Sequence, residues 1–241
     1  MEYPVFLYTV RFLTDHYESV LKMNFIHTQM DKYAKKIAEY LLQIKAIKLQ
    51  PSNPFTWASG WKSPIYCDNR KTLSFPEVRS CIRDSFYEVV RDFYPEAGLI
   101  AGVATGAIAH GVLVAEKLGL PFIYVRSEPK EHGLGNQIEG YFEAGQKVVV
   151  IEDLISTGGS SLGAVKALRD AGCDLLGMAA IFTYEFKKAA DGFASARCEL
   201  HTLSNYSTLI SAAAEAGYIN TKDIETLKQW RMDPSSWGIN R

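Results

Sequence analysis

The sequence has almost no net charge and no cysteine pattern of a metal site or a disulfide framework. Its formal charge is −1 at pH 7, which gives no general attraction to nucleic acid or membranes. Its four cysteines form no CxxC pair, and no histidine lies at zinc-ligand spacing, so a reducing compartment is expected. No apolar run approaches the roughly 18 residues of a membrane span. We therefore expect a cytoplasmic protein that binds neither nucleic acid nor membranes.

Internal repeats and low-complexity linkers are also lacking, which favours one main domain. With 241 residues, 47% of them hydrophobic, the chain can bury one good core with a small accessory lobe. Residues 5–13 are apolar, but Arg11 interrupts them and no small-residue cleavage site follows. We expect no signal peptide there.

Strands and helices are expected to alternate from residue 98 onward. Helices are expected at 31–44, where Pro51 and Pro54 prevent continuation, and at 76–94, 106–118 and 221–231. The expected strands are residues 98–103, 121–125, 138–142, 147–151, 175–183 and 199–203. This alternation predicts an α/β fold with a parallel sheet.

The most informative run is VVVIEDLISTGGSS, residues 148–161. Four β-branched residues predict a strand buried on both faces, and Glu152 and Asp153 follow it. A turn of small residues, 156–160, then precedes a helical pattern. Glycines allow close approach of a ligand, and the turn's N–H groups with the helix dipole suit a phosphate. Carboxylates at this edge of a sheet can accept hydrogen bonds from a sugar diol, so the run predicts a ribose 5-phosphate site.

A simpler interpretation is a strand-to-helix turn that Ser160 caps, with Glu152 and Asp153 merely solvated. The acidic pair joined directly to a five-residue Ser/Thr/Gly turn favours the ligand site. The turn 102–107, after the first core strand, could likewise hold pyrophosphate through backbone N–H groups, or be a plain connection.

Three segments together resemble the orotate phosphoribosyltransferases of the type I phosphoribosyltransferase family. Residues 148–161 are similar to the family's motif for phosphoribosyl pyrophosphate (PRPP). The run YVRSEPKEHGLGN, residues 124–136, resembles its mobile catalytic loop, and PFTWASGWKSPIYCDNR, residues 54–70, resembles its N-terminal substrate segment. The resemblance covers about residues 31–241.

The resemblance implies a type I phosphoribosyltransferase fold, a parallel sheet flanked by helices with a small N-terminal lobe that covers the substrate. Residues 30–75 would form the N-terminal helix and lobe, and residues 76–241 the PRPP-binding α/β core with a C-terminal helix. Residues 1–29 fit poorly, so they are either an extra segment or precede a true start at Met23 or Met30.

The implied activity is a glycosyltransferase reaction of pyrimidine (UMP) biosynthesis, in which orotate and PRPP give orotidine 5′-monophosphate and pyrophosphate. Mg²⁺ would arrive bound to PRPP oxygens, so no protein metal site is expected. The partners would be these substrates and a second copy of the chain, in a homodimer whose catalytic loops are shared across subunits.

The resemblance also implies residue roles. The expected catalytic residues are Lys130, His132, Glu152 and Asp153, with the proton donor left open between Lys130 and His132. The expected PRPP-binding residues are these four with Arg126, Thr105, Gly106, Leu154, Ile155, Ser156, Thr157, Gly158, Gly159 and Ser160. The expected orotate-binding residues are Ser156, Tyr184, Lys62 and Tyr66.

Four positions depart from the family's pattern. Basic residues of some members are replaced by Ala58, Gly106, Ser127 and Tyr184. Lys62 is as well explained as an ordinary surface lysine. Two other functions stay open: transfer to another base such as uracil or a purine, and a PRPP-sensing regulator whose N-terminal segment binds DNA or a partner.

Overall fold

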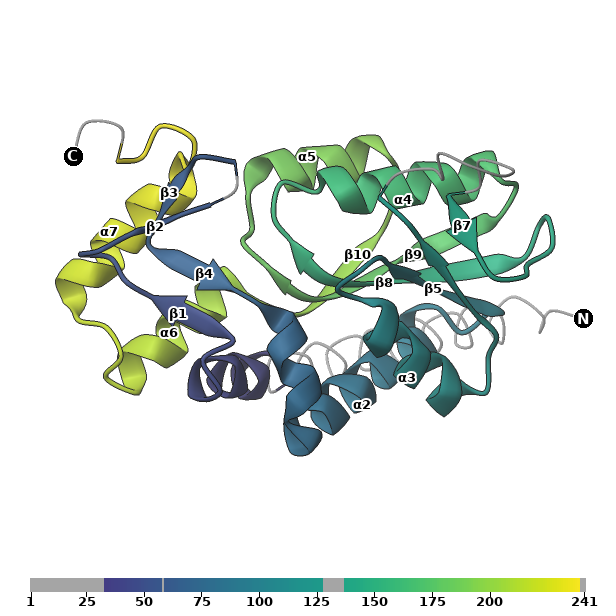
Figure 1. Cartoon of the computed structure of the whole chain (residues 1–241), viewed down its shortest axis with the longest axis horizontal. Coiled ribbons are helices and arrows are strands. Elements are labelled where there is room, and N and C mark those ends of the chain that lie inside the picture. Colours follow the sequence, from purple (N-terminus) through teal and green to yellow (C-terminus); the bar gives the residue numbers. More distant parts are fainter. Residues whose placement is uncertain (1–32, 58, 128–136, 239–241) are drawn as a thin grey trace, which may run out of the picture.

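One six-stranded sheet forms the centre of the fold (Figure 1). The computed structural model describes residues 33–57, 59–127 and 137–238. The strand order is β10-β9-β8-β5-β6-β7, and all neighbours are parallel except β6 and β7. The strands are β5 (Leu99–Val103), β6 (Phe122–Val125), β7 (Ile138–Glu139), β8 (Lys147–Ile155), β9 (Asp174–Thr183) and β10 (Leu200–Asn205).

Helices cover both faces of this sheet, which explains its all-apolar strands. Along β8, Val149 and Ile151 belong to one core cluster, whereas Val148 and Val150 belong to the other. Helices α2 and α3 contribute to the first cluster, and α4 and α5 to the second (Figure 1). The helices are α2 (Pro76–Phe93), α3 (Ile108–Leu118), α4 (Gly159–Asp170), α5 (Lys187–Ser195), α6 (Tyr206–Glu215) and α7 (Thr221–Met232). The predicted α/β fold with a mainly parallel sheet is confirmed.

Two of the observed strands differ from the predicted ones by three or more residues at one end, and the others by at most two. Strand β8 does not end at Ile151 but continues through the acidic pair to Ile155, because β9 remains its partner as far as Thr183. Strand β7 ends at Glu139 rather than at residue 142, and it runs antiparallel to β6. The acidic pair, Glu152 and Asp153, therefore lies on the strand itself and not in the loop after it.

A small lobe lies beside the sheet, at the left in Figure 1. A helix at residues 33–43 precedes β1 (Ile47–Leu49), which pairs with β4 (Ile65–Cys67), while β2 (Phe55–Thr56) pairs with β3 (Lys62–Ser63). The far end of the chain joins this lobe. Trp230 of α7 donates a hydrogen bond to the Lys62 carbonyl over 3.2 Å, and its ring packs edge-on against Trp57. The division of the chain after residue 75 stays a prediction.

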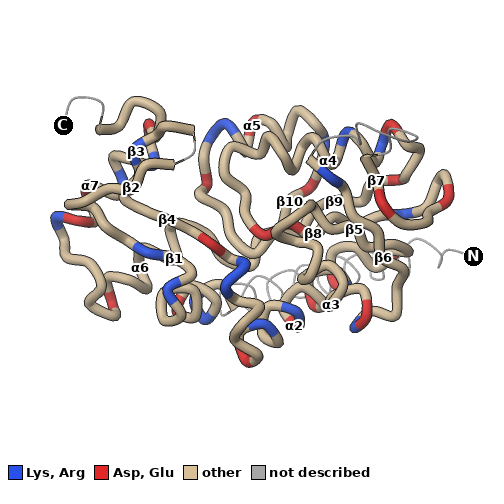
Figure 2. The backbone as a smooth tube through the Cα atoms, in the orientation of Figure 1, with Lys and Arg blue, Asp and Glu red and all other residues tan. Residues whose placement is uncertain are grey.

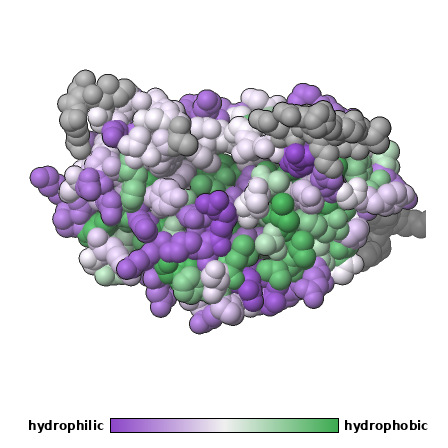
Figure 3. Space-filling view, in the orientation of Figure 1, coloured by the Kyte–Doolittle hydropathy of each residue, from purple (hydrophilic) through white to green (hydrophobic). Residues whose placement is uncertain are grey.

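Basic and acidic residues are interspersed along the described chain (Figure 2). Hydrophilic residues cross the middle of the face in Figure 3, and hydrophobic residues show on either side. Among the residues that the structure describes, no helix combines the length and apolar character required to cross a bilayer.

Candidate active site

The candidate site lies where two neighbouring parallel strands end. Strands β5 and β8 are adjacent, with Gly102 opposite Ile151, and each is followed by a turn and a helix. From β5 the chain continues to β6, which pairs with one edge of β5, whereas β8 pairs with the other edge. The strand order therefore reverses between β5 and β8. Ligands of open α/β sheets bind outside the carboxyl ends of strands at such a reversal.

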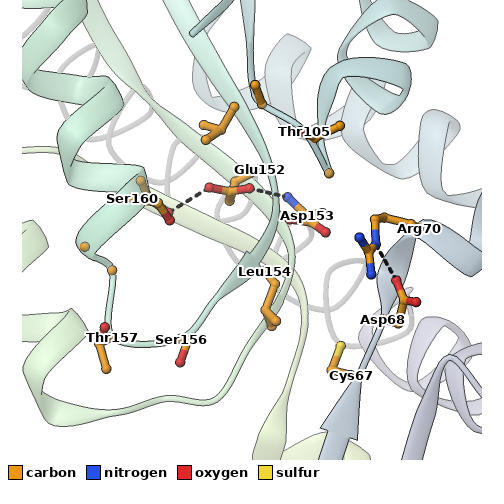
Figure 4. Close-up of a pocket in the computed structure, with 16 residues that line it drawn as sticks. Cys67, Asp68, Arg70, Thr105, Glu152, Asp153, Leu154, Ser156, Thr157 and Ser160 are labelled. Carbon is orange, nitrogen blue, oxygen red and sulfur yellow. Dashed lines mark hydrogen bonds and ion pairs between the residues drawn. The ribbon is translucent and has the colours of Figure 1, made fainter. Parts of the chain in front are cut away.

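A cavity of about 510 Å³ opens at this position (Figure 4). Three segments contribute its walls: the end of β4 with the residues after it, the turn after β5, and the end of β8 with the start of α4. The lining residues are Cys67, Asp68, Arg70, Val103, Ala104, Thr105, Gly106, Glu152, Asp153, Leu154, Ser156, Thr157, Gly158, Gly159, Ser160 and Ser161. Most of the predicted PRPP-binding residues are therefore brought together.

The two carboxylates of the acidic pair lie in different surroundings. Glu152 is only 4% exposed; it accepts hydrogen bonds from the Ser161 hydroxyl over 2.8 Å and from the Asp153 N–H over 2.9 Å. Burial, and then the neighbouring charge of Asp153, raise the pKa of Glu152 to about 8. Asp153 is only partly buried and lines the cavity. Glu152 thus holds the strand and helix together, and Asp153 is the carboxylate accessible to a ligand.

Two contacts fix the position of Asp153. The Asn69 side-chain amide donates to the Asp153 carbonyl over 2.5 Å, and Asn69 is 1% exposed. On the other side, a Cβ atom added to Gly106 would overlap the Asp153 carboxylate. The Asp153 carboxylate therefore lies directly against the turn after β5, and a side chain at residue 106 would displace it. The Ala104–Thr105 peptide bond in this turn is cis.

The turn at the start of α4 is suited to an anion. Gly158 precedes the helix with a φ of 82°, in the left-handed region that favours glycine. No side chain of the described residues caps this helix end, so the interpretation in which Ser160 is the cap is wrong. The first residues of α4 line the cavity, and the N–H groups at a helix start have no partner within the helix, which suits a phosphate. Ile155 differs from its neighbours, because its side chain is completely buried in the core.

A second, aromatic cavity of about 300 Å³ adjoins the first and shares Cys67, Leu154 and Ser156 with it. Its other lining residues are Thr56, Trp57, Tyr66 and Tyr184. Tyr184 is 2% exposed, and its ring lies 5.3 Å from that of Trp57. Burial raises the pKa of Tyr184 well above its usual value, so its phenol stays neutral. This cavity has the flat apolar walls that suit a planar ring.

Relatives of this chain share the chemistry that the two cavities suggest. The phosphoribosyl transferase domain family matches residues 75–205. The orotate phosphoribosyltransferase of Porphyromonas gingivalis is 55% identical over 210 residues, covering 87% of this chain and 100% of that protein. The chain belongs to the orotate phosphoribosyltransferases. The enzyme of Phocaeicola vulgatus is 57% identical, with 86% of this chain and 98% of that protein covered.

A solved orotate phosphoribosyltransferase structure also matches the fold. The enzyme of Aeropyrum pernix superposes with a TM-score of 0.67 at 27% identity, covering 76% of this chain and 99% of that chain. The family and fold predicted from the three sequence segments are therefore confirmed.

The predicted orotate-binding residues of this orotate phosphoribosyltransferase divide into two groups. Ser156, Tyr66 and Tyr184 line the aromatic cavity. Lys62 lies outside the lining of both cavities, and its ammonium donates to the Thr56 hydroxyl over 2.8 Å. An ammonium group has three donors, so this hydrogen bond leaves two of the Lys62 donors for other partners.

The predicted loop residues are only partly visible. Arg126 follows β6, and its Nη1 lies 3.7 Å from Glu139 Oε1, outside the lining of both cavities. Lys130 and His132 lie outside the described residues. The joint action of these three residues on pyrophosphate stays a prediction.

Several residues of this site were not singled out from the sequence. Asn69, Arg70 and Trp57 belong to the segment 54–70 that resembles the family, but a matched segment does not tell which of its side chains face a cavity. Arg70 donates from Nε to Asp68 Oδ1 over 2.7 Å at the cavity wall (Figure 4). The only sequence signal for these residues was their position within the matched segment.

Proposed function

We propose that the two adjoining cavities hold PRPP and orotate, the substrates of orotate phosphoribosyl transfer, which is the activity of this family in pyrimidine biosynthesis. The observation that carries the proposal is that a polar cavity with a phosphate turn and a partly exposed carboxylate adjoins an aromatic cavity and shares three lining residues with it. A base in the second cavity would face a ribose in the first. N1 of orotate would attack C1′ of the ribose as the bond to pyrophosphate breaks.

In the first cavity, each segment would bind one part of PRPP. The segment 154–160, which includes the end of β8 and the start of α4, would bind the 5′-phosphate through its N–H groups and hydroxyls. Asp153 would accept hydrogen bonds from the ribose hydroxyls, and its negative charge would stabilise the positive charge that develops at C1′. Glu152 would act by holding Asp153 and the start of α4 in place.

The pyrophosphate would lie toward the turn that contains Thr105 and Gly106. Arg126, Lys130 and His132 would stabilise it as it departs, with Lys130 or His132 as the proton donor. In the second cavity, orotate would lie between the rings of Trp57, Tyr66 and Tyr184 and would hydrogen-bond to Ser156. Lys62, which lies outside both linings, would take part only if its side chain moved toward the cavity, with its remaining donors free to contact orotate.

The donor set fits a Mg²⁺ ion that is bound mainly by PRPP. Among the described residues, no three His, Cys, Asp or Glu side chains converge as a metal-binding group. Mg²⁺ is commonly held by one or two carboxylates with substrate phosphates and water, and Asp153 is the partly exposed carboxylate of the cavity. When bound, the ion would neutralise charge on the pyrophosphate.

We further propose that the enzyme works in the cytoplasm as a symmetric homodimer. The loop that carries Lys130 and His132 in one subunit would complete the site formed by Glu152 to Ser160 of the other. Four cysteines that form no disulfide support the cytoplasmic assignment.

The decisive experiment follows the loss of ultraviolet absorbance of orotate with the purified protein. Orotate should be consumed only when PRPP and Mg²⁺ are both present, and orotidine 5′-monophosphate should accumulate. Uracil, hypoxanthine and adenine should react far more slowly under the same conditions. Turnover of uracil at the rate of orotate would reject the orotate assignment, and chelation of Mg²⁺ without effect would reject the role of the metal.

A further inference from the structure

Arg70 is the one cation among the described residues that line the PRPP cavity. The same lining contains the carboxylates of Asp68 and Asp153, and also Glu152, whose raised pKa of about 8 leaves it largely protonated near pH 7. A ligand with a phosphate and a pyrophosphate would meet net negative charge there unless cations offset it. The turn after β5 offers only backbone N–H groups and the Thr105 hydroxyl. Arg70 is therefore the described side chain best suited to bind an anionic group.

The guanidinium of Arg70 is held in place but not fully used. Its Nε donates to Asp68 Oδ1 over 2.7 Å, and its side chain remains 62% exposed. Its two Nη groups make no hydrogen bond to protein within the described part of the chain. A guanidinium with two accessible donors suits a phosphate oxygen pair. Arg70 can thus bind an anion through its Nη groups and keep the hydrogen bond from Nε to Asp68.

The turn that carries Arg70 is anchored on both sides. Arg70 lies in the 3-10 helix η1 (Asn69–Ser74), where Asn69 donates to the Asp153 carbonyl. The Thr72 hydroxyl donates to the Asn69 carbonyl over 2.5 Å and lies 3.1 Å from His110 Nε2 of α3. Because Asn69, Thr72 and His110 are each at most 1% exposed, this polar chain is buried. It fixes Arg70 relative to Asp153.

The position of Arg70 indicates which part of PRPP it meets. In Figure 4, the phosphate turn with Ser156 and Thr157 lies on one side of Asp153, and Arg70 lies on the other, near Thr105. Arg70 lines the first cavity but not the aromatic one. A 5′-phosphate on the turn and a ribose at Asp153 leave the pyrophosphate end for Arg70. We infer that Arg70 binds the pyrophosphate group of PRPP, a role that rests on the proposed function.

The test compares Arg70→Gln and Arg70→Lys with the wild type in both reaction directions. Lys48→Gln is the matched control, because Lys48 is an exposed lysine of the same lobe outside both cavities. Arg70→Gln should raise KM for PRPP, and KM for pyrophosphate in the reverse reaction, about tenfold, the low end for a charged hydrogen bond because the group is exposed. KM for orotate and for orotidine 5′-monophosphate should change less than about twofold. Arg70→Lys should lie between the wild type and Arg70→Gln.

A structural role would give a different pattern. Calorimetry with inorganic pyrophosphate and Mg²⁺ should show weaker binding for Arg70→Gln, and guanidinium ions should partly restore kcat/KM to Arg70→Ala. The inference would be overturned if KM for PRPP and for pyrophosphate were unchanged in an active Arg70→Gln enzyme. It would also be overturned if only KM for orotate and for orotidine 5′-monophosphate rose. If Arg70→Gln does not fold, an unchanged pyrophosphate constant in Arg70→Lys together with no guanidinium rescue would do the same. A wild type without orotate turnover would instead reject the proposed function.

Discussion

Glu152 and Asp153 are chemically similar neighbours with different surroundings. Glu152 is buried beneath the cavity and hydrogen-bonded to Ser161, whereas Asp153 is partly exposed and faces the ligand space. The alternation of side chains along β8 produces this difference, since successive residues of a strand point to opposite faces. Substitutions of the two residues should therefore have different consequences.

We expect Asp153→Asn to lower kcat about a hundredfold, because its charge matters most when C1′ becomes cationic. KM for PRPP should change much less, since the phosphate turn supplies most of the ground-state binding. Steady-state kinetics with varied PRPP measures both. Asp174→Asn is the control, because Asp174 is an exposed carboxylate at the start of β9, at the edge of the sheet opposite to the cavity. It should leave both constants unchanged. An increase in KM for PRPP with kcat intact would show a purely binding role for Asp153.

For Glu152, we expect a stability that depends on pH. Its pKa is raised from 4.5 to about 8 in the folded chain, so the folded state retains a proton that the unfolded state releases. The stabilisation is fully present below about pH 4.5 and is lost as the pH rises toward about 8. Relative to Glu152→Gln, the wild type should lose a few kcal/mol of unfolding free energy between about pH 5 and pH 8.

Urea unfolding of both proteins at several pH values measures this difference. Glu116→Gln serves as the control, because Glu116 is an exposed residue of α3. Its difference from the wild type should not vary with pH. A constant difference between the wild type and Glu152→Gln over the same range would contradict the prediction.

Among single residues, the sequence predicted those that are consecutive in one motif, but not those that only the folded chain brings to the site. Glu152 to Ser160 are consecutive residues that span the end of β8, the turn and the start of α4, so their chemistry could be inferred from their order. Asn69 is 84 residues from Asp153, whose carbonyl it binds, and only the packing of η1 on β8 brings the two together. Arg70 and Trp57 were missed for the same reason.

The contact between two turns determines the geometry at the scale of elements. The turn after β5 and the end of β8 approach so closely that Gly106 lies against the Asp153 carboxylate. The clash from a side chain at 106 would fall on the end of a rotatable side chain rather than on backbone. A side chain at residue 106 can therefore be accommodated by rotation of the Asp153 side chain, which leaves the fold intact but moves the carboxylate out of its position in the cavity.

We accordingly expect Gly106→Ala to lower kcat about as much as Asp153→Asn, with a melting temperature close to that of the wild type. Gly163→Ala is the matched control, because an added Cβ there meets open space on the exposed face of α4. It should retain full activity and gain up to about 1 kcal/mol of stability from helix propensity. A large loss of melting temperature in Gly106→Ala with normal activity per folded molecule would contradict this account.

Elements were predicted well where periodicity was strong and less well at their ends. The apolar runs of β5, β8 and β9 indicated buried parallel strands, and the core clusters on both faces confirm them. The extension of β8 to Ile155 was missed, because two carboxylates are atypical of a strand. Pairing with β9 overrides that local preference.

At the scale of the whole molecule, the proposed dimer predicts complementation between two damaged subunits. A Lys130→Ala subunit and an Asp153→Asn subunit would each be nearly inactive alone. In their heterodimer, one site would contain both lesions and the other neither. Equal mixing with free exchange should therefore restore about a quarter of the wild-type activity.

The heterodimer must be verified by native mass spectrometry with one subunit tagged. Mixing of Lys130→Ala with a tagged Lys130→Ala provides the control and should stay inactive. If verified heterodimers of the two variants remain inactive, loop and phosphate turn belong to the same subunit. An active, strictly monomeric enzyme would exclude sharing.

The contact between Trp230 and the lobe has a consequence for the order of assembly during synthesis. Trp230 binds the carbonyl of Lys62, a residue 168 positions earlier, and its ring packs on Trp57 in the aromatic cavity. The residues that line the PRPP cavity all lie between 67 and 161, so they leave the ribosome well before α7. A growing chain can therefore assemble the sugar-phosphate half of its site first. The base half is completed only when the last helix has been translated.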